Sequence, residues 1–241
     1  MKFSKNNRTV FSVINGLMLL LAVWGCGPSD TKTDSKPAPG PTATTPATKS
    51  TPSSTKQTVL FFGNSLAAGY GVEPSQAFPV LIGQKIDSAG LNYTVVNAGL
   101  SGETTAGGKS RIGWVLRQPV AVFVLELGGN DGLRGLPLTA TRRNLQAIMD
   151  TVRRKSPQAT IVLAGMQIPP NLGTDYTREF RELFKQLADK NGAILIPFLL
   201  ENVGGIPKLN QSDGIHPNPA GHKIVAETVW GVIRLVLEKK V

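Results

Sequence analysis

The chain has 241 residues and a formal net charge of +10, and this length fits one domain with appendages. Its one cysteine excludes an intramolecular disulfide framework and a cysteine-rich zinc site, and its two histidines exclude a histidine-rich metal centre. Beyond residue 57 the basic side chains are scattered, and they cluster only at Arg142 and Arg143 and at 153–155. No aromatic residues interleave these clusters, so the composition argues against nucleic-acid binding.

Residues 1–25 have the pattern of a secretory signal peptide. A basic start precedes an apolar stretch over residues 10–24, which is shorter than the ~20 residues that a membrane-spanning helix needs. The alternative is an N-terminal anchor that is never cleaved. The end of the segment, from Val23 to Cys26, resembles a bacterial lipoprotein box, in which the signal is cut before the cysteine and the cysteine is lipidated. The resemblance implies an exported protein that is anchored to a bacterial membrane through Cys26.

The residues after Cys26 refine this expectation. Gly27 follows the cysteine, where Asp retains lipoproteins in the inner membrane of many Gram-negative bacteria. The resemblance therefore favours the periplasmic face of the outer membrane, and a periplasmic or secreted protein is the alternative. Residues 26–57 have almost no large apolar side chain, so burial cannot offset their ordering entropy. They predict a disordered linker, followed by one folded domain over residues 58–241, which we expect to be a monomer.

Continuous apolar runs alternate with amphipathic stretches from residue 58 onward. The runs predict strands that are covered on both faces, at residues 59–62, 94–97, 120–127, 159–165 and 193–196. Helical spacing predicts two helices, marked by Leu145, Ile148, Met149 and Val152, and by Phe180, Leu183, Phe184 and Leu187. A last helix over residues 219–238 is predicted to bury Val225, Val229, Val232 and Val236. This alternation predicts an α/β fold, a three-layer sandwich on a parallel sheet, whose ligands bind beyond the carboxyl ends of the strands.

The first predicted strand is followed by Gly63, Asn64 and Ser65. A glycine that leaves a buried strand, before a serine that enters a helix, places the hydroxyl at the carboxyl edge of the sheet. The start of the helix favours an anion at this point. The pattern is weak by itself, because a serine here is more often a helix N-cap than a nucleophile.

The loop before the last helix carries the partners that a serine nucleophile needs. Asp213 and His216 are three residues apart on a segment that contains Gly214 and Pro217. A base must take the proton of the serine, and a carboxylate must fix the tautomer of that base and stabilise the imidazolium. One turn brings carboxylate and imidazole side by side. His222 lies within the last helix, and we interpret it as a surface or half-buried structural histidine.

Two further loops supply polar groups. Gly102, after the second strand, permits close backbone approach, so its N–H can face a bound oxyanion; the alternative is a plain helix start. Asn130, after the third strand, can donate a second hydrogen bond from its amide. The alternative there is a turn, because Gly-Asn-Asp is ordinary turn chemistry. Four such loops around one sheet favour a functional site over coincidence.

With these loops the sequence resembles the SGNH (GDSL-type) hydrolases. Within that family it resembles most strongly the branch that acts as acyl thioesterase, lysophospholipase and arylesterase. The matching stretches are 62–70, 96–104, 125–135 and 213–218. The resemblance covers essentially all of residues 58–241. It implies a flavodoxin-like, three-layer α/β/α sandwich with a five-stranded parallel sheet.

The resemblance also implies the roles of the site residues. Ser65 is then the nucleophile, His216 the base and Asp213 the carboxylate that orients it. The oxyanion hole consists of the N–H groups of Ser65 and Gly102 and the side chain of Asn130. No cofactor or metal is implied. The departure from the family is Asn64, where Asp is usual, and Asn keeps the acceptor oxygen while it loses the charge.

We therefore predict a serine esterase that hydrolyses carboxylic esters through an acyl-serine intermediate. The substrates expected are small-molecule aryl or alkyl esters, lysophospholipids or acyl thioesters. Leu133, Leu136, Gln167 and Ile168 are predicted to line the acyl pocket. One alternative is a carbohydrate or peptidoglycan O-deacetylase of the same fold, for which a more polar or aromatic pocket is expected. The other is a non-catalytic binding module, which an ester-hydrolysis assay distinguishes.

Overall fold

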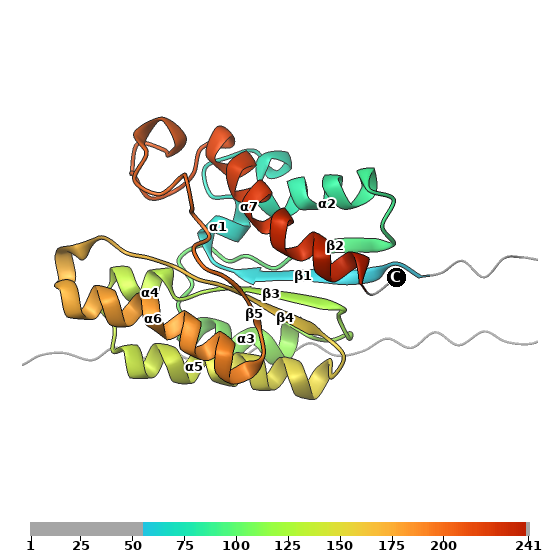
Figure 1. The fold of residues 1–241 in the computed structure, drawn as a ribbon, viewed down its shortest axis with the longest axis horizontal. Coiled ribbons are helices and arrows are strands. Elements are labelled where there is room, and N and C mark those ends of the chain that lie inside the picture. The colour runs from blue at the N-terminus through green and yellow to red at the C-terminus, as the bar shows by residue number, and fades with distance from the viewer. Residues whose placement is uncertain (1–54, 240–241) are drawn as a thin grey trace, which may run out of the picture. The chain divides into compact units, whose positions relative to one another are not determined.

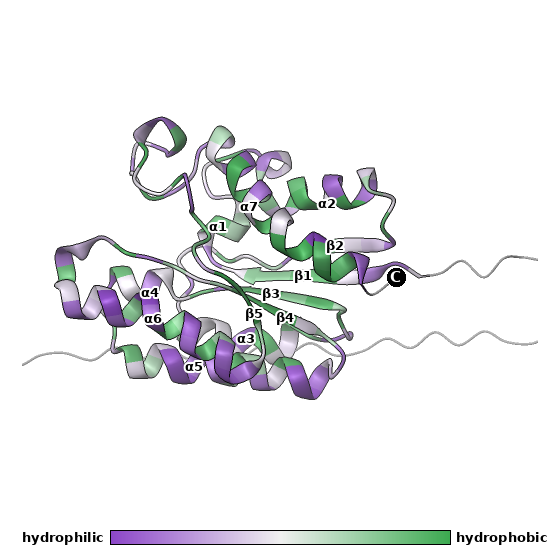
Figure 2. Cartoon of the chain, in the orientation of Figure 1, coloured by the Kyte–Doolittle hydropathy of each residue, from purple (hydrophilic) through white to green (hydrophobic). Residues whose placement is uncertain are grey.

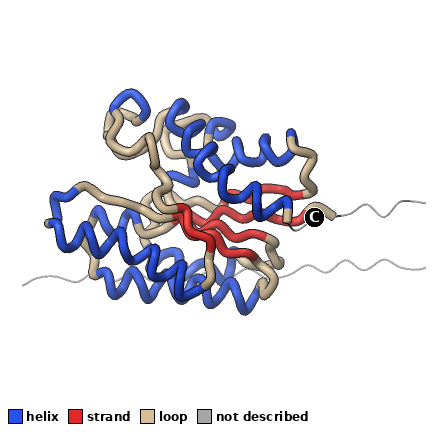
Figure 3. Tube along the Cα trace, in the orientation of Figure 1, coloured by secondary structure: helices blue, strands red, loops and turns tan. Residues whose placement is uncertain are grey.

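The computed structural model describes residues 55–239, and its centre is a sheet of five parallel strands in the order β2-β1-β3-β4-β5 (Figures 1 and 3). The strands are β1 (Gln57–Gly63), β2 (Tyr93–Asn97), β3 (Val122–Glu126), β4 (Thr160–Ala164) and β5 (Ile194–Ile196). Each overlaps one of the predicted apolar runs. The five strands and the parallel sheet expected from the sequence are thus confirmed.

Helices cover both faces of this sheet and give the predicted three layers (Figure 1). On one face lie α2 (Phe78–Ser88) and α7 (Pro219–Glu238), and the short α1 (Ser65–Ala68) follows the end of β1. On the other face lie α3 (Thr105–Val115), α4 (Gly129–Leu133), α5 (Leu138–Lys155) and α6 (Thr174–Asn191). Short 3-10 helices η1 (Pro74–Gln76), η2 (Pro170–Leu172) and η3 (Pro207–Leu209) lie in the connections.

The position of a strand in the sheet determines how well it is covered. β3 is buried along its whole length, because its register places it between β1 and β4. β2 and β5 are the edge strands, and Thr94, Val96 and Ile194 are exposed there. Cover on both faces was therefore the wrong expectation for these two strands, because the helical layers do not extend fully over the edges of the sheet. Hydrophobic residues concentrate in the sheet, while the helices show both kinds (Figure 2).

The apolar stripe of α7 differs from the prediction at one position. Val225, Val229 and Val236 are buried as expected, but Val232 is half-buried and Ile233 is buried instead. In a helix with 3.6 residues per turn, the steps from residue 225 to 229, to 233 and to 236 keep one face toward the core. The buried position is therefore Ile233. The predicted apolar faces of α5 and α6 are buried in full.

The predictions for the N-terminal segment lie almost entirely outside the described residues. They comprise the signal peptide over 1–25, lipidation of Cys26 and the linker over 26–57, of which only the last three residues are described. β1 already begins at Gln57. Within residues 55–239, no helix combines the length and the hydrophobicity that crossing a membrane requires.

Candidate active site

Ser65 is the first residue of α1 and follows the carboxyl end of β1. Asn64 caps this helix, because its Oδ1 accepts the N–H of Leu66 at 3.0 Å. The hydroxyl of Ser65 lies 3.3 Å from the same oxygen. The N-cap is therefore Asn64, and the hydroxyl of Ser65 is not used for capping as the alternative interpretation expected.

His216 and Asp213 complete a line of three side chains. His216 Nε2 lies 2.8 Å from Ser65 Oγ, and His216 Nδ1 lies 2.6 Å from Asp213 Oδ2. The other carboxylate oxygen accepts the N–H groups of Ile215 at 2.9 Å and of His216 at 3.0 Å. The backbone N–H of His216, more than its ring or the N–H of Ile215, lowers the pKa of Asp213 to about 2. The carboxylate is thus charged at neutral pH and faces the imidazole.

Two residues that the sequence analysis missed hold the histidine loop. The backbone N–H of Gln211 donates to the carbonyl of His216 at 2.7 Å, and the side-chain amide of Gln211 donates to the carbonyl of Tyr70 at 2.7 Å. The ring of Tyr70 lies against the imidazole of His216, with 4.8 Å between the ring centroids. These contacts join the segment after α1 to the loop that carries the base.

Glu126, the last residue of β3, is the most important residue that the sequence analysis missed. It is fully buried. One carboxylate oxygen accepts the N–H groups of Asn64 at 3.0 Å and Ala67 at 3.3 Å, and the other accepts the side-chain N–H of Asn64 at 2.8 Å. Burial raises the pKa of Glu126 to about 8, although the three N–H donors act in the opposite direction. This carboxylate holds the turn on which Ser65 lies.

A signal for Glu126 was present in the sequence, since it is a charged residue inside an otherwise apolar strand run. Gly63 belongs to the same arrangement. A Cβ at Gly63 would overlap the carboxylate of Glu126 and the side chain of Ala67. Glycine is therefore required here by the close approach of the Glu126 side chain to the backbone of β1.

The loop that contains Gly102 is fixed from the side of α4. The amide of Asn130 donates to the carbonyl of Glu103 at 3.0 Å, and the guanidinium of Arg134 donates to the carbonyl of Gly102 at 3.2 Å. Gly102 has a φ of 79°, a conformation that favours glycine. Asn130 lies in α4 and not in the turn that was its alternative. It lines the same cavity as Ser65, while Gly102 lies in the adjoining loop.

A cavity of about 420 Å³ opens at Ser65 and His216, within the ~300–1,000 Å³ typical of ligand pockets. Its apolar lining residues are Leu66, Leu133, Met166, Ile168, Pro169, Phe198, Leu200 and Ile215. Of the predicted pocket residues, Leu133, Gln167 and Ile168 line this cavity. Leu136 does not. Its carbonyl instead accepts the hydroxyl of Tyr176 at 2.8 Å, outside the cavity.

His222 lies elsewhere and differs from expectation in its burial. It is 1% exposed, not on the surface or half-buried, because the start of α7 packs against α2. Its Nδ1 accepts the N–H of Phe78 at 3.3 Å. Burial, and then the nearby His216, lower the pKa of His222 to about 4, so it is neutral at pH 7. Its contacts are those of a structural residue.

A hydroxyl, an imidazole and a carboxylate in line at the carboxyl edge of a parallel sheet define a serine hydrolase of the α/β class. Within residues 55–239, no group of three or more His, Cys, Asp and Glu side chains is placed to hold a metal ion. Residues 61–224 match the GDSL-like lipase/acylhydrolase family, and the chain belongs to this family.

Similar proteins agree with this assignment. The esterase TesA of Pseudomonas aeruginosa is 38% identical over 182 residues, which cover 75% of this chain and 90% of that protein. Thioesterase 1/protease 1/lysophospholipase L1 of Escherichia coli K12 is 38% identical over 171 residues, 70% of this chain and 80% of that protein. A crystal structure of TesA superimposes with a TM-score of 0.72 at 38% identity, over 75% of this chain and 100% of its own. The protein is thus a serine ester hydrolase.

Proposed function

We propose that Ser65 attacks the carbonyl carbon of a carboxylic ester and forms an acyl-serine intermediate, which water then hydrolyses. The observation that carries this proposal is the distance of 2.8 Å between Ser65 Oγ and His216 Nε2. At this distance His216 can take the proton as the oxygen attacks. Asp213 accepts the N–H at Nδ1, which fixes the tautomer and stabilises the imidazolium that forms.

The remaining steps use the same groups. As the tetrahedral intermediate forms, its oxyanion is stabilised by the N–H groups of Ser65 and Gly102 and by the amide of Asn130. Loss of one such donor typically costs about 10²–10³ in kcat. The imidazolium of His216 gives its proton to the leaving alcohol or thiol. His216 then takes a proton from the water that attacks the acyl carbon. It gives this proton to Ser65 Oγ as the bond between that oxygen and the acyl carbon breaks and the carboxylic acid leaves.

The cavity supports esters with an apolar acyl chain as substrates. Eight apolar side chains line it, and among the predicted residues Leu133 and Ile168 lie on its wall together with the amide of Gln167. We propose aryl and alkyl esters, with lysophospholipids and acyl thioesters as further substrates. The names of relatives mention an esterase, an arylesterase, and a thioesterase and lysophospholipase. An O-deacetylase of carbohydrate or peptidoglycan is less well supported, because this wall is mainly apolar.

A chain-length series tests the substrate class. We expect kcat/KM for p-nitrophenyl esters to rise from acetate to a medium-length acyl chain, with lysophospholipid and acyl-CoA assayed alongside. Acetate as the best substrate, with steady decline for longer chains, would favour the deacetylase. Turnover no higher than that of Ser65→Ala for every ester would leave only a binding module.

We further propose that the protein is exported and lipid-anchored through Cys26, at the periplasmic face of the outer membrane where the host has one. The support is the sequence from Val23 to Cys26 and the absence of Asp after it. The linker over residues 26–57 then connects the anchor to the catalytic domain, which we expect to be monomeric.

A further inference from the structure

We propose that the outer surface of α3 and α5 docks the catalytic domain on an anionic lipid bilayer, with the active site turned away from that bilayer. We call this surface the basic face. It consists of the exposed basic residues Lys109, Arg117, Arg143, Arg153, Arg154 and Lys155, together with Trp114. The inference goes beyond ester hydrolysis and stands on observations outside the active site.

The distribution of charge singles out this surface. Residues 105–117 and 138–155 carry eight basic side chains and one acidic one, Asp150. All the other described residues together carry eleven basic and thirteen acidic side chains. Of the eight, Arg111 and Arg142 are half-buried, and Arg111 is paired with Glu103 at 2.5 Å, so these two do not belong to the surface. The positive excess of the domain therefore lies on two helices that pack side by side, and such a cluster attracts an anionic membrane.

Trp114 gives the basic face an apolar centre. Its side chain is 66% exposed, more than any other large hydrophobic residue exposed in residues 55–239. The guanidinium of Arg117 lies 4.5 Å from the centre of its ring. Tryptophan is the side chain that prefers the interface between lipid and water, and flanking cations bind the headgroup phosphates.

Stabilisation of the helices themselves explains only some of the basic residues on this surface. Cations in the last turn of a helix interact favourably with its dipole, which covers residues 153–155. Lys155 also donates to the carbonyls of Gly113 at 2.6 Å and Leu116 at 3.1 Å. No such role applies to Lys109, which lies in the middle of α3, or to an exposed tryptophan.

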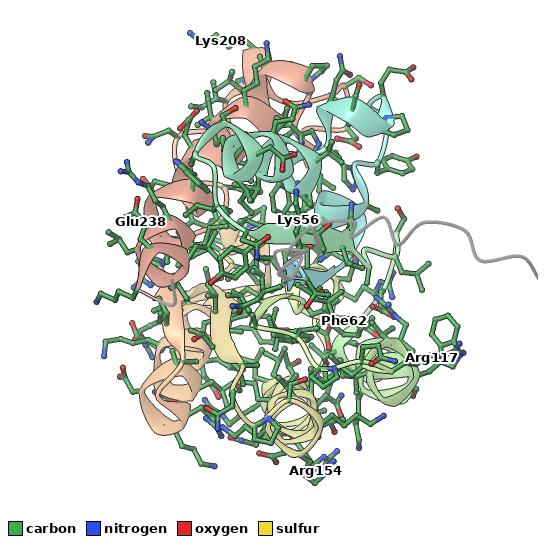
Figure 4. The ribbon with its side chains drawn as sticks, turned by 90° about the vertical axis from the view of Figure 1, so that its right-hand side faces the viewer. Lys56, Phe62, Arg117, Arg154, Lys208 and Glu238 are labelled. Carbon is green, nitrogen blue, oxygen red and sulfur yellow. The ribbon has the colours of Figure 1, made fainter. Side chains whose placement is uncertain are left out.

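The part of the basic face formed by Trp114, Arg117 and residues 153–155 lies at the end of the sheet opposite the active site. The hydroxyl of Ser156, just after α5, accepts the N–H of Val120 at 3.1 Å, so α5 ends beside the start of β3. Ser65, by contrast, follows the carboxyl end of β1, which runs parallel to β3. Figure 4 is a view from the end where β1 begins, and it labels Lys56, Arg117 and Arg154.

The N-terminal part of the chain joins the domain at this same end. Residues 55–58 and 119–121 line a common hollow of about 560 Å³. The second of these segments begins two positions after Arg117 in the sequence. A chain anchored through Cys26 thus reaches the domain beside the basic face. An anchor and a weak surface contact on one membrane reinforce each other, because the second contact becomes intramolecular. Esters then enter the active site from the aqueous side.

The test uses residues 27–241 without lipid, so that failure of the anchor or of the esterase proposal cannot be mistaken for failure of this one. A crystal structure of TesA is matched over 100% of its length by 75% of this chain, so the domain folds without the N-terminal segment. Binding is measured by co-sedimentation with vesicles of phosphatidylcholine alone or mixed equally with phosphatidylglycerol. Hydrolysis of a soluble p-nitrophenyl ester verifies that each variant is folded.

Two double variants with the same change in net charge are compared. Arg117→Glu/Arg154→Glu alters the basic face, and Lys208→Glu/Lys223→Glu alters exposed lysines elsewhere, with Lys208 far from Arg154 in Figure 4. We expect the wild type to bind only the anionic vesicles, and the first variant to bind them at least about tenfold more weakly. The second variant should stay within about twofold, and Trp114→Ala should also weaken binding.

Equal loss in the two double variants would overturn the proposal, because net charge alone would then explain the binding. Equal binding to neutral vesicles, or none to anionic ones, would also overturn it. Tighter binding to a short DNA duplex than to the anionic vesicles at one ionic strength would assign the basic face to nucleic acid instead.

Discussion

Three N–H groups converge on the buried carboxylate of Glu126, and two of them belong to Asn64, the residue just before Ser65. An Asp at position 64 would place a second carboxylate where the Asn64 amide now donates at 2.8 Å. Two carboxyl groups so close cannot both be charged without strong repulsion. The neutral side chain of Asn64 thus suits a position beside the buried carboxyl group of Glu126, whose own ionisation burial already disfavours.

Exchange of the two groups tests this pairing. Asn64→Asp and Glu126→Gln should each lower kcat about tenfold, or ~1.4 kcal/mol, because each puts two carboxylates or two amides face to face. KM should change little, since neither side chain is expected to bind the acyl group. The double variant again pairs one amide with one carboxylate, and it should return to within about threefold of the wild type. Rates are measured from pH 5 to 9.

If the losses in kcat of the two single variants multiply in the double variant, the proposed pairing of Asn64 with Glu126 is wrong. The pH profile separates this positioning effect from a general loss of stability. Only Asn64→Asp brings two carboxyl groups together, so only this variant should recover activity as the pH falls and one group is protonated.

The two histidines are expected to differ sharply. His216→Ala should lower kcat by at least about 10³-fold, because members of a catalytic triad act as a unit. His222→Asn should stay within about threefold, since His222 contacts the backbone of Phe78 and not Ser65. Steady-state rates on one p-nitrophenyl ester are sufficient. A reversed order would show that the wrong histidine has been taken as the base.

The residues of the site were predictable to different degrees. Ser65, Asp213 and His216 were found from the chemistry of their residue types and from motif resemblance, and the structure brings them together. Glu126 was missed because its role depends on N–H donors from β1 and α1, which are distant in the sequence. Leu136 was wrongly placed in the cavity, because a loop position alone does not determine which way a side chain points.

At the scale of elements, the contact between α2 and α7 depends on a neutral histidine. Between pH 4 and 6.5 the unfolded chain binds a proton at His222 that the folded protein does not, so stability rises with pH over this range. Glu126 has the opposite effect. Between pH 4.5 and 8 the folded protein retains a proton that the unfolded chain has lost, so stability falls as pH rises.

These opposed effects predict the shape of the stability curve. From these two groups, wild-type stability should be nearly level from pH 4.5 to 6.5 and decline from 6.5 to 8. In His222→Asn, which keeps an acceptor for Phe78, the decline should already begin at pH 4.5. In Glu126→Gln stability should rise to pH 6.5 and then stay level. Urea unfolding across the range measures this, and identical curves for the three proteins would refute it.

The elements themselves were predictable because their patterns are strong. Each strand contains a continuous apolar run, and α5 and α6 have a clear helical period. What the sequence lacks is the order of strands in the sheet. That order makes β2 and β5 edge strands and exposes Val96 and Ile194, although both lie in apolar runs.

At the scale of the whole molecule, folding gathers basic residues that looked scattered in the sequence. The end of α3, with Trp114 and Arg117, lies beside Lys155 only because α3 packs against α5. The sequence likewise gave no aromatic neighbour for the cluster at 153–155, and the fold supplies Trp114. The active site thus lies at one end of the sheet, and Trp114, Arg117 and residues 153–155 of the basic face lie at the other.

The proposed anchor is tested on the full chain. Wild-type protein produced in a bacterial host should fractionate with membranes and incorporate labelled palmitate. Cys26→Ser should abolish the label, because Cys26 is the only cysteine in the chain. Wild-type protein that is soluble and unlabelled would leave plain secretion as the explanation.

Labelling of the nucleophile tests the central claim most directly. The protein is treated with an alkyl organophosphonate, and its peptides are analysed by mass spectrometry beside an ester-hydrolysis assay. We expect one adduct per molecule, located on Ser65, with activity lost in proportion to labelling. Ser65→Ala should show neither adduct nor turnover and should keep the melting temperature of the wild type. An adduct on another residue, or ester hydrolysis that persists in Ser65→Ala, would contradict the account.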